Sequence, residues 1–312
     1  MSSSPVVIGT RGSRLALRQT ELTLARLQSA NPETLFQVRE IHTSGDKSDR
    51  SLTEIGGRGV FVIELERALL GGDIDIAVHS LKDLPSEETE GLALVALLPR
   101  DDPRDVLISR TGGDLRSLPD EGAGVGTGSP RRAAQLRALR PGLRIEDIRG
   151  NIDTRLRKVE EGQYDAVVLA AAGLARLGWL DRASEIFDVN TMLPAVGQGA
   201  IAVQVRTDDE RVTGLVRTAD DAATRAAVTA ERAFERRLGG GCQAPIAAYA
   251  VTDTVGLRLR ALVGNEDGSI IRGDAEGPLS KPEGLGIDLA ERLINEGAAP
   301  FAAGVGDEGV TG

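Results

Sequence analysis

The sequence predicts an α/β protein in which helices cover largely parallel sheets, with a small α+β module at the C-terminal end. Three observations carry this prediction. Strand-like apolar runs alternate with helix-like periodic segments, a polar break marked by prolines divides these units into two sets, and the C-terminal part changes to short alternating segments. With 312 residues the chain is also longer than one hydrophobic core usually supports, so two or three domains are expected.

The first set of units begins with an apolar, β-branched run from Val6 to Thr10. Gly12 and Ser13 lead from this strand into a helix expected from Arg14 to about Ser29, with Ser13 as its N-cap. The same reasoning predicts three further elements: a strand over Phe36–Thr43, a helix over Val60–Leu70 and a strand over Ile74–Val78. Alternation of this kind is typical of parallel strands joined by helical crossovers.

A polar segment bounded by Pro99 and Pro103 separates the first set from the second, and we expect a domain boundary there. Beyond it, Ser129 and Pro130 are typical of an N-cap and a first helical residue. The elements predicted for this second set are strand Val125–Thr127, helix Arg131–Leu139, strand Ile145–Ile148, helix Thr154–Glu161 and strand Ala166–Ala170. Pro194 to Gly199, followed by an apolar run to Val205, predicts that the chain returns to the first domain.

The C-terminal part begins with a long helix expected over Ala222–Leu238, which three glycines end before Cys242. A strand over Leu257–Val263 and a helix over Ile287–Asn295 complete the predicted α+β module. The expected domains are therefore residues 1–99 with 200–217, residues 100–199, and residues 218–312.

Composition excludes several classes of function. Hydrophobic residues make up 41% and charged residues 27%, which fits a globular protein rather than a disordered one. A single cysteine rules out an internal disulfide framework. One cysteine and two histidines in the whole chain are too few for a typical zinc site, so no metal is expected. A net charge of −10 argues against sequence-independent nucleic-acid binding. The chain shows no apolar run of membrane-spanning length and no secretion signal at its start, so we expect a cytoplasmic protein.

The segment from His79 to Pro85 follows an apolar strand, at the end where α/β sheets present ligands. Asp83 is the natural candidate for an acid or base, although a loop aspartate that caps local amides would look the same. His79 ends a buried strand and is better explained as a hydrogen-bonded core residue than as a catalyst.

Arginines recur where strands end and helices begin. Of the 37 basic residues, only four are lysine. The arginines at such positions are Arg11, Arg131, Arg132, Arg149 and Arg155. Helix N-termini and guanidinium forks both bind anions, so this edge of the sheets suits several carboxylates or a polyphosphate, while surface ion pairing is the alternative for each arginine alone.

Two nucleotide-binding patterns are disfavoured by their spacing. The glycines at 124, 126 and 128 do not have the G-x-G-x-x-G spacing of a dinucleotide site, and the sequence contains no Walker loop. Cys242 carries two interpretations. A lone cysteine is commonly a small buried apolar residue, but the three preceding glycines favour an exposed thiol, so a covalent role is reasonable.

Taken together, these stretches resemble the porphobilinogen deaminase (hydroxymethylbilane synthase) family, from about Val6 to Gly264. The matching motifs occur in the expected order: Gly9–Ser13 with Leu15–Leu17, Gly56–Gly59 with Phe61, Ala77–Pro85, Gly126–Arg132, Arg149–Asn151, Leu193–Gly199 and Gly240–Pro245. The resemblance implies two domains similar to type II periplasmic binding proteins and a third domain that carries the cofactor cysteine.

The resemblance also implies an activity. A dipyrromethane cofactor would be attached to Cys242 by a thioether, and Asp83 would be the main catalytic group. Four molecules of porphobilinogen would be joined head to tail on this primer with loss of ammonia, and water would release hydroxymethylbilane. Cofactor and substrate carboxylates would be held by residues carried over by motif: Arg11, Ser13, Lys82, Thr127, Ser129, Arg131, Arg132, Arg149, Arg155 and Arg176. The family pattern implies a monomer.

Three positions depart from the family pattern. Arg58 stands where many relatives have lysine, Gly128 replaces a serine, and an extra glycine enlarges the loop before Cys242. Two alternatives stay open on the residues alone: a solute-binding protein for an anionic ligand, which would leave Cys242 unused, and a different transferase on the same scaffold.

Overall fold

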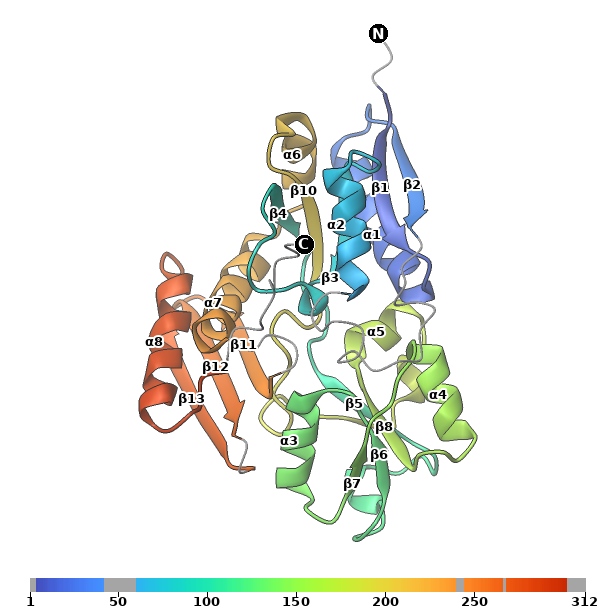
Figure 1. The fold of residues 1–312 in the computed structure, drawn as a ribbon, viewed down its shortest axis with the longest axis vertical. Helices are drawn as coiled ribbons and strands as arrows, with labels where there is room; N and C mark the ends of the chain where they lie inside the picture. The colour runs from blue at the N-terminus through green and yellow to red at the C-terminus, as the bar shows by residue number, and fades with distance from the viewer. Residues whose placement is uncertain (1–3, 42–59, 240–243, 266–267, 302–312) are drawn as a thin grey trace, which may run out of the picture.

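The computed structural model describes residues 4–41, 60–239, 244–265 and 268–301. Within them the chain forms three sheets, two with five strands and one with three. In Figure 1 the first sheet lies at the top, the second at the lower right and the third at the lower left. The expected class is confirmed: two α/β units and a smaller α+β unit.

The first sheet has the strand order β2-β1-β3-β10-β4. Strands β1, β2 and β3 are parallel, while β10 runs antiparallel to both of its neighbours. Its strands are β1 Val6–Arg11, β2 Phe36–Ile41, β3 Ile76–Ser80, β4 Leu92–Leu97 and β10 Ile201–Arg206. Helices α1 (Arg14–Ala30) and α6 (Glu210–Arg217) pack on one face through Leu27 and Val212, and α2 (Val60–Leu70) packs on the other through Leu65.

The second sheet repeats this arrangement, with the order β7-β6-β8-β5-β9 and an antiparallel β5 in the place of β10. Its strands are β5 Asp105–Ser109, β6 Gly124–Gly126, β7 Arg144–Glu146, β8 Ala166–Ala170 and β9 Glu185–Ile186. Helix α3 (Pro130–Leu139) covers one face through Leu136, whereas α4 (Ile152–Glu160) and α5 (Ala171–Arg176) cover the other. The short 3-10 turns are η2 Leu81–Asp83, η3 Leu115–Ser117 and η4 Leu180–Arg182.

The chain crosses between these two sheets twice. The first crossing joins β4 to β5 through residues 98–104, and the second joins β9 to β10 through residues 187–200. After the second crossing, β10 lies between β3 and β4 of the first sheet. Gly197 and Gly199 have positive φ angles of 68° and 92°, and a Cβ on Gly199 would lie 2.5 Å from the Asp101 carbonyl oxygen, so the two crossings approach each other closely.

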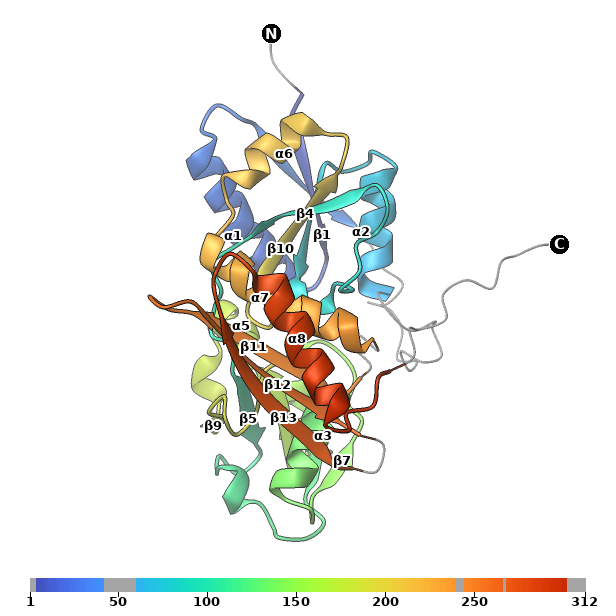
Figure 2. The ribbon, with the colours of Figure 1, turned by 90° about the vertical axis from the view of Figure 1, so that its left-hand side faces the viewer.

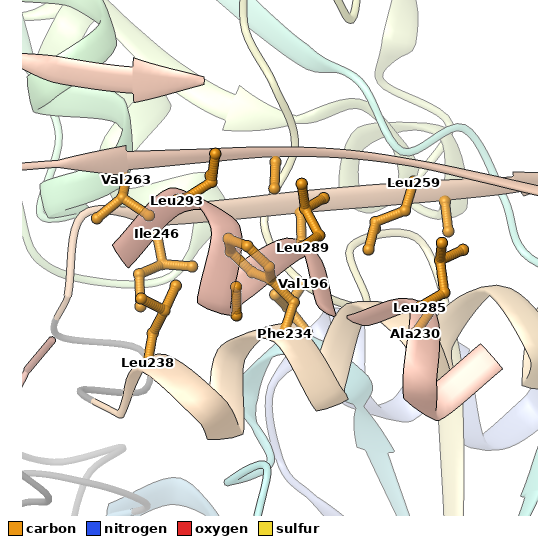
Figure 3. Packing of buried hydrophobic residues seen from close by; sticks show 14 of the residues in the cluster. Val196, Ala230, Phe234, Leu238, Ile246, Leu259, Val263, Leu285, Leu289 and Leu293 are labelled. Atoms are coloured by element: carbon orange, nitrogen blue, oxygen red, sulfur yellow. The ribbon is translucent and has the colours of Figure 1, made fainter. Parts of the chain in front are cut away.

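The C-terminal unit is an antiparallel sheet, β11-β12-β13, covered by two helices. Its elements are β11 Ile246–Thr252, β12 Leu257–Gly264, β13 Ile270–Gly277, α7 Ala222–Leu238 and α8 Pro282–Asn295. Figure 2 shows α8 in front of this sheet, and Figure 3 shows Phe234 and Leu289 packed between the helices and the strands.

Most predicted boundaries agree with the structure. Helices α2 and α7 and strand β8 begin and end where the sequence predicted. Strand β3 is shifted by two residues and reaches Ser80, and α8 begins earlier, at Pro282, a residue suited to a first helical turn. The sheets are mixed rather than largely parallel at one edge, because each crossing strand enters in the opposite direction. No helix in the described part of the chain is long and apolar enough to cross a membrane.

Candidate active site

Asp83 lies on the short turn η2, directly after the buried strand β3. The residues on both sides of the turn, Leu81 and Leu84, are buried, whereas Asp83 itself is exposed. The turn is fixed from two sides, because the Leu81 amide donates to the Ala200 carbonyl at 3.1 Å and Gln19 of α1 donates to the Ser80 hydroxyl at 2.7 Å. The fold therefore presents the Asp83 carboxylate on a turn that hydrogen bonds hold in place.

Lys82 brings a positive charge from the same turn to the second crossing. Its Nζ donates to Oε1 of Gln198 at 3.3 Å. The pKa of Lys82 is lowered to about 8, mainly by burial and also by the charge of nearby Arg132, whereas the charge of Asp83 acts in the opposite direction. Because the charge of Arg132 acts on it, Lys82 belongs to an electrostatic cluster shared by the first and second sheets.

Arg131 and Arg132 open helix α3 and are both buried. Their guanidinium groups converge on Asp105, the first residue of β5: Arg131 Nη1 donates to Oδ2 at 2.7 Å, and Arg132 Nη2 donates to Oδ1 at 2.7 Å. Arg132 Nε also donates to Asp105 Oδ1 at 3.1 Å, and each arginine donates to one main-chain carbonyl, Arg131 to that of Leu193 and Arg132 to that of Val168. Two of the predicted carboxylate binders are therefore already oriented by a carboxylate of the protein.

Asp105 is fully buried, and its carboxylate accepts hydrogen bonds from the side chains of Arg131, Arg132 and Gln198. Burial opposes ionisation of its carboxyl, but the Arg131 and Arg132 guanidinium groups hold its pKa well below the usual range. Gln198 adds a bond from Nε2 to Asp105 Oδ1 at 3.0 Å, and a second to the Pro103 carbonyl at 2.6 Å. One carboxylate thus balances two arginines, which leaves net positive charge at this point.

Arg149 and Arg155 extend the positive cluster along the second domain. Arg149 Nε donates to Asp147 Oδ2 at 2.8 Å, and Arg155 Nε donates to the Gly150 carbonyl at 2.7 Å. The pKa of Arg155 is lowered to about 10, mainly by burial and also by the charges of Arg132 and Arg149. Asp83 acts on Arg155 in the opposite direction, which relates this arginine to the turn η2.

Contacts within this cluster explain why glycine fits at position 128. A Cβ built on Gly128 would lie 2.9 Å from Asp147 Oδ1 and 3.2 Å from Arg149 Nη1. Such contacts are tighter than ordinary packing, so a larger residue would displace the Asp147–Arg149 pair. The departure from the family pattern at 128 therefore allows this close pairing.

Arg176 is placed at the crossings and is bonded there. Its Nε donates to Asp101 Oδ2 at 2.8 Å, and its Nη2 donates to the Gly199 carbonyl at 2.6 Å. Burial lowers the pKa of Arg176, and Asp101 opposes that shift. The side chain therefore joins the end of α5 to both segments that connect the two large domains.

The predicted hydroxyl residues accept hydrogen bonds from the main chain. Ser13 accepts from the Ala16 amide at 3.3 Å, Ser129 accepts from the Arg132 amide at 3.4 Å, and Thr127 accepts from the Ser129 amide at 3.2 Å. Ser13 and Ser129 are therefore N-caps, as predicted for both helices. Each hydroxyl can still donate its own proton to an anion.

Arg11 is the last residue of β1, and its charge acts on His79. His79 is buried, and burial lowers its pKa to about 4, against the effect of neighbouring Gln204, so it is neutral near pH 7. This agrees with the interpretation of His79 as a core residue rather than a catalyst.

Sequence reasoning missed three residues that organise this region: Asp105, Gln198 and Glu231. A signal existed for the first, since an aspartate directly ahead of the apolar run Val106–Ile108 is unusual for a buried strand. Two predicted features, Cys242 and Arg58, lie outside the described residues.

Comparisons with known proteins identify the family. The model of the porphobilinogen deaminase dipyromethane cofactor binding domain matches residues 6–214, and the model of the porphobilinogen deaminase C-terminal domain matches residues 225–295. A porphobilinogen deaminase from Roseiflexus sp. (strain RS-1) is 51% identical over 96% of this chain and 99% of its own length. One from Brevibacillus brevis is 48% identical over 96% of each chain.

Among solved structures, the periplasmic VFT2 domain of Bordetella pertussis BvgS aligns with 68% of this chain and 86% of its own, at 16% identity and a TM-score of 0.43. The two family models together span both large domains and most of the C-terminal unit, in the same order as the motifs. On this coverage and identity, the chain belongs to the porphobilinogen deaminase family.

Proposed function

We propose that Asp83 is the catalytic acid of this porphobilinogen deaminase and that the cations around it hold the carboxylates of cofactor and substrate. In this proposal the chain is a transferase that joins four porphobilinogen units head to tail, expels one ammonia per unit and releases hydroxymethylbilane by hydrolysis. Cys242 carries the dipyrromethane as a thioether.

The observation that carries the proposal is an excess of positive charge beside one exposed acid. The charge of Asp83 raises the pKa of both Lys82 and Arg155, and the charge of Arg132 lowers both pKa values. Asp105 neutralises only part of the charge of its two arginines. A ligand with an acetate and a propionate on every ring would supply the missing negative charge.

The proton chemistry follows from what a carboxyl group can do at this position. Protonated Asp83 donates to the aminomethyl nitrogen of porphobilinogen, so that ammonia leaves as a neutral molecule. The resulting carboxylate then stabilises the delocalised azafulvenium cation and accepts hydrogen bonds from pyrrole N–H groups. When bound, the dipyrromethane would supply the carbon nucleophile for the first unit, and the Asp83 carboxylate can accept the ring proton that this carbon loses as the new bond forms.

The residues present fit that cofactor. Among the described side chains, the buried Nε of Arg131 has no hydrogen-bond partner, which leaves a donor for an added carboxylate. Thr127 and Ser129 retain hydroxyl donors at the start of the same helix, where the free amides also favour an anion. Arg11, Ser13, Lys82, Arg132, Arg149, Arg155 and Arg176 complete the proposed carboxylate-binding set.

A solute-binding protein for an anionic ligand is the alternative from a different class. It would need the same cations but neither an exposed acid at the turn η2 nor a thiol.

We also propose that the protein is a cytoplasmic monomer that binds neither nucleic acid nor membrane. Its working domain division is 1–99 with 200–217, 100–199 and 218–312, which agrees with the three sheets.

Intact-mass measurement tests the proposal. The native chain is expected to exceed its sequence mass by one dipyrromethane, and Cys242→Ser is expected to lose that excess and all turnover of porphobilinogen. A native chain of unmodified mass that still consumes porphobilinogen would remove the covalent cofactor. A native chain that binds porphobilinogen without releasing ammonia would favour the solute-binding alternative.

A further inference from the structure

Helix α7 is bonded to the turn that carries Asp83. Arg232 in this helix is buried, and its Nη2 donates to the Pro85 carbonyl at 2.7 Å. Arg236, one helical turn later, reaches the next carbonyl, that of Ser86, at 3.4 Å. The chain just after Asp83 is therefore held by the C-terminal unit as well as by its own domain.

The bond to Pro85 is well placed to fix Asp83 itself. Only Leu84 separates the two residues, and Leu84 is buried among Val62, Leu97 and Val228 of α7. Pro85 adds stiffness, because its ring restricts the backbone angle φ. A guanidinium that is largely shielded from water also forms a stronger hydrogen bond to a carbonyl than an exposed one. Displacing Pro85 would therefore displace the catalytic carboxylate.

The C-terminal end of α7, close to Arg232 and Arg236, leads to the proposed cofactor cysteine. The helix ends at Leu238 and is followed by Gly239, which has a positive φ of 77°. A helix rises about 1.5 Å per residue, so Gly239 begins roughly 10 Å along the axis from Arg232. Cys242 follows three residues later in the sequence. The same rigid element thus contacts the turn of the acid and precedes the attachment point.

We propose that Arg232 is a positioning residue for the deaminase reaction: its hydrogen bond to the Pro85 carbonyl fixes the position of Asp83 relative to helix α7. This inference rests on the function proposed above. Every addition must bring the reacting atoms beside the same carboxylate, so that carboxylate must be held firmly in one position. Small displacements of a catalytic group are costly in rate.

The test compares two arginines of the same helix. Arg232→Met keeps much of the apolar stem but loses the donor to Pro85. Arg225→Met is the matched control, since Arg225 also donates from α7 to a carbonyl of the first domain, Val95 at 2.7 Å, and pairs with Asp220, but it does so at the other end of the helix. Turnover is measured per cofactor-loaded chain, with loading read from intact mass and stability from thermal unfolding.

We expect Arg232→Met to lower kcat per loaded chain by about tenfold or more, with a much smaller change in KM. Arg225→Met should lower the melting temperature and leave kcat per loaded chain near the native value. Equal losses of kcat in both variants would overturn the proposal, because the effect would then come from general docking of α7. Native kcat in Arg232→Met would also overturn it. Arg232→Lys, which keeps one donor, is expected to lie between native and Arg232→Met.

Two readouts separate positioning from stability. In an Asp83→Asn background there is no acid to position, so adding Arg232→Met should not slow single-turnover formation of the first enzyme–pyrrole adduct any further. Penalties that multiply would contradict the proposed role. Hydrogen exchange gives a measurement independent of activity. The amides of Leu84 and of residues 86–90 should exchange faster in Arg232→Met than in the native chain, and at the native rate in Arg225→Met. If the native chain itself lacks the cofactor mass and turnover, the proposed function fails, whatever Arg232 does.

Discussion

The carboxylate of Glu231 binds the guanidinium of Arg100 through both oxygens, at the point where helix α7 meets both crossings of the chain. The same carboxylate accepts the Gly197 amide of the second crossing at 2.8 Å and the Ala250 amide of β11 at 2.8 Å. Arg100 also lies over the Tyr249 ring, 5.0 Å from its centroid. One buried acid therefore joins the C-terminal unit to both crossings between the two larger units.

Glu231→Gln is expected to destabilise the protein strongly. The amide removes the charge that balances Arg100, and breaking a buried ion pair on one side costs about 3–5 kcal/mol. Unfolding in denaturant measures the loss. Glu276→Gln serves as control, because the Arg258–Glu276 pair is exposed and such pairs contribute about 0–1 kcal/mol. Similar losses in the two variants would mean that Glu231 does not connect the units energetically.

Asp83→Asn should retain the fold and the cofactor but lose turnover by about 10²-fold or more, the usual contribution of a positioned acid. An amide can neither protonate the leaving amine nor balance a cation. Ammonia release measures the rate, and intact mass checks cofactor loading. Asp181→Asn is the matched control, since Asp181 is an exposed aspartate on another 3-10 turn, η4. Native rates in Asp83→Asn would transfer the acid role to another group.

Arg149→Ala should slow elongation, because the proposed set loses a cation that binds the carboxylates of the growing chain. Mass spectrometry is expected to show enzyme–pyrrole adducts that stop before the fourth unit. Arg144→Ala provides the comparison: Arg144 pairs with Glu146 two residues away, as Arg149 pairs with Asp147. The Arg144 variant should pass through every adduct. Normal progression of the Arg149 variant would remove that residue from the set.

Local patterns in the sequence predicted the elements but not the contacts that join them. Helix α7 could be delimited because its periodicity ends at glycines, and the turn carrying Asp83 could be placed because it follows an apolar strand. The ion pairs of Asp105 with Arg131 and Arg132 could not be predicted, because 26 and 27 residues separate the partners and no local spacing relates them. The same holds for Glu231 and Arg100, which are 131 residues apart.

The arginine set shows the same limit in more detail. Sequence position placed these arginines at strand and helix ends, and the structure brings Arg132 within electrostatic reach of both Lys82 and Arg155. Position alone could not tell which of these arginines would form ion pairs with carboxylates of the protein itself. Arg176 binds Asp101 and Arg149 binds Asp147, whereas Arg155 donates to a neutral carbonyl. Ion pairing inside the set depends on side-chain packing that a single sequence does not reveal.

His79 should make the protein sensitive to mild acid. Its pKa is about 4 in the folded chain and 6.5 in the unfolded chain, so between these values the unfolded chain binds more protons. Stability is therefore fully retained above pH 6.5 and falls as the pH approaches 4, by about 3 kcal/mol from this group. Denaturant unfolding at several pH values measures the slope. His79→Asn does not titrate, so it should show a shallower slope in this window, even if it is less stable at pH 7. An equal slope in both proteins would mean that the folded chain accommodates a charged His79, and that the acid sensitivity arises from carboxylates alone.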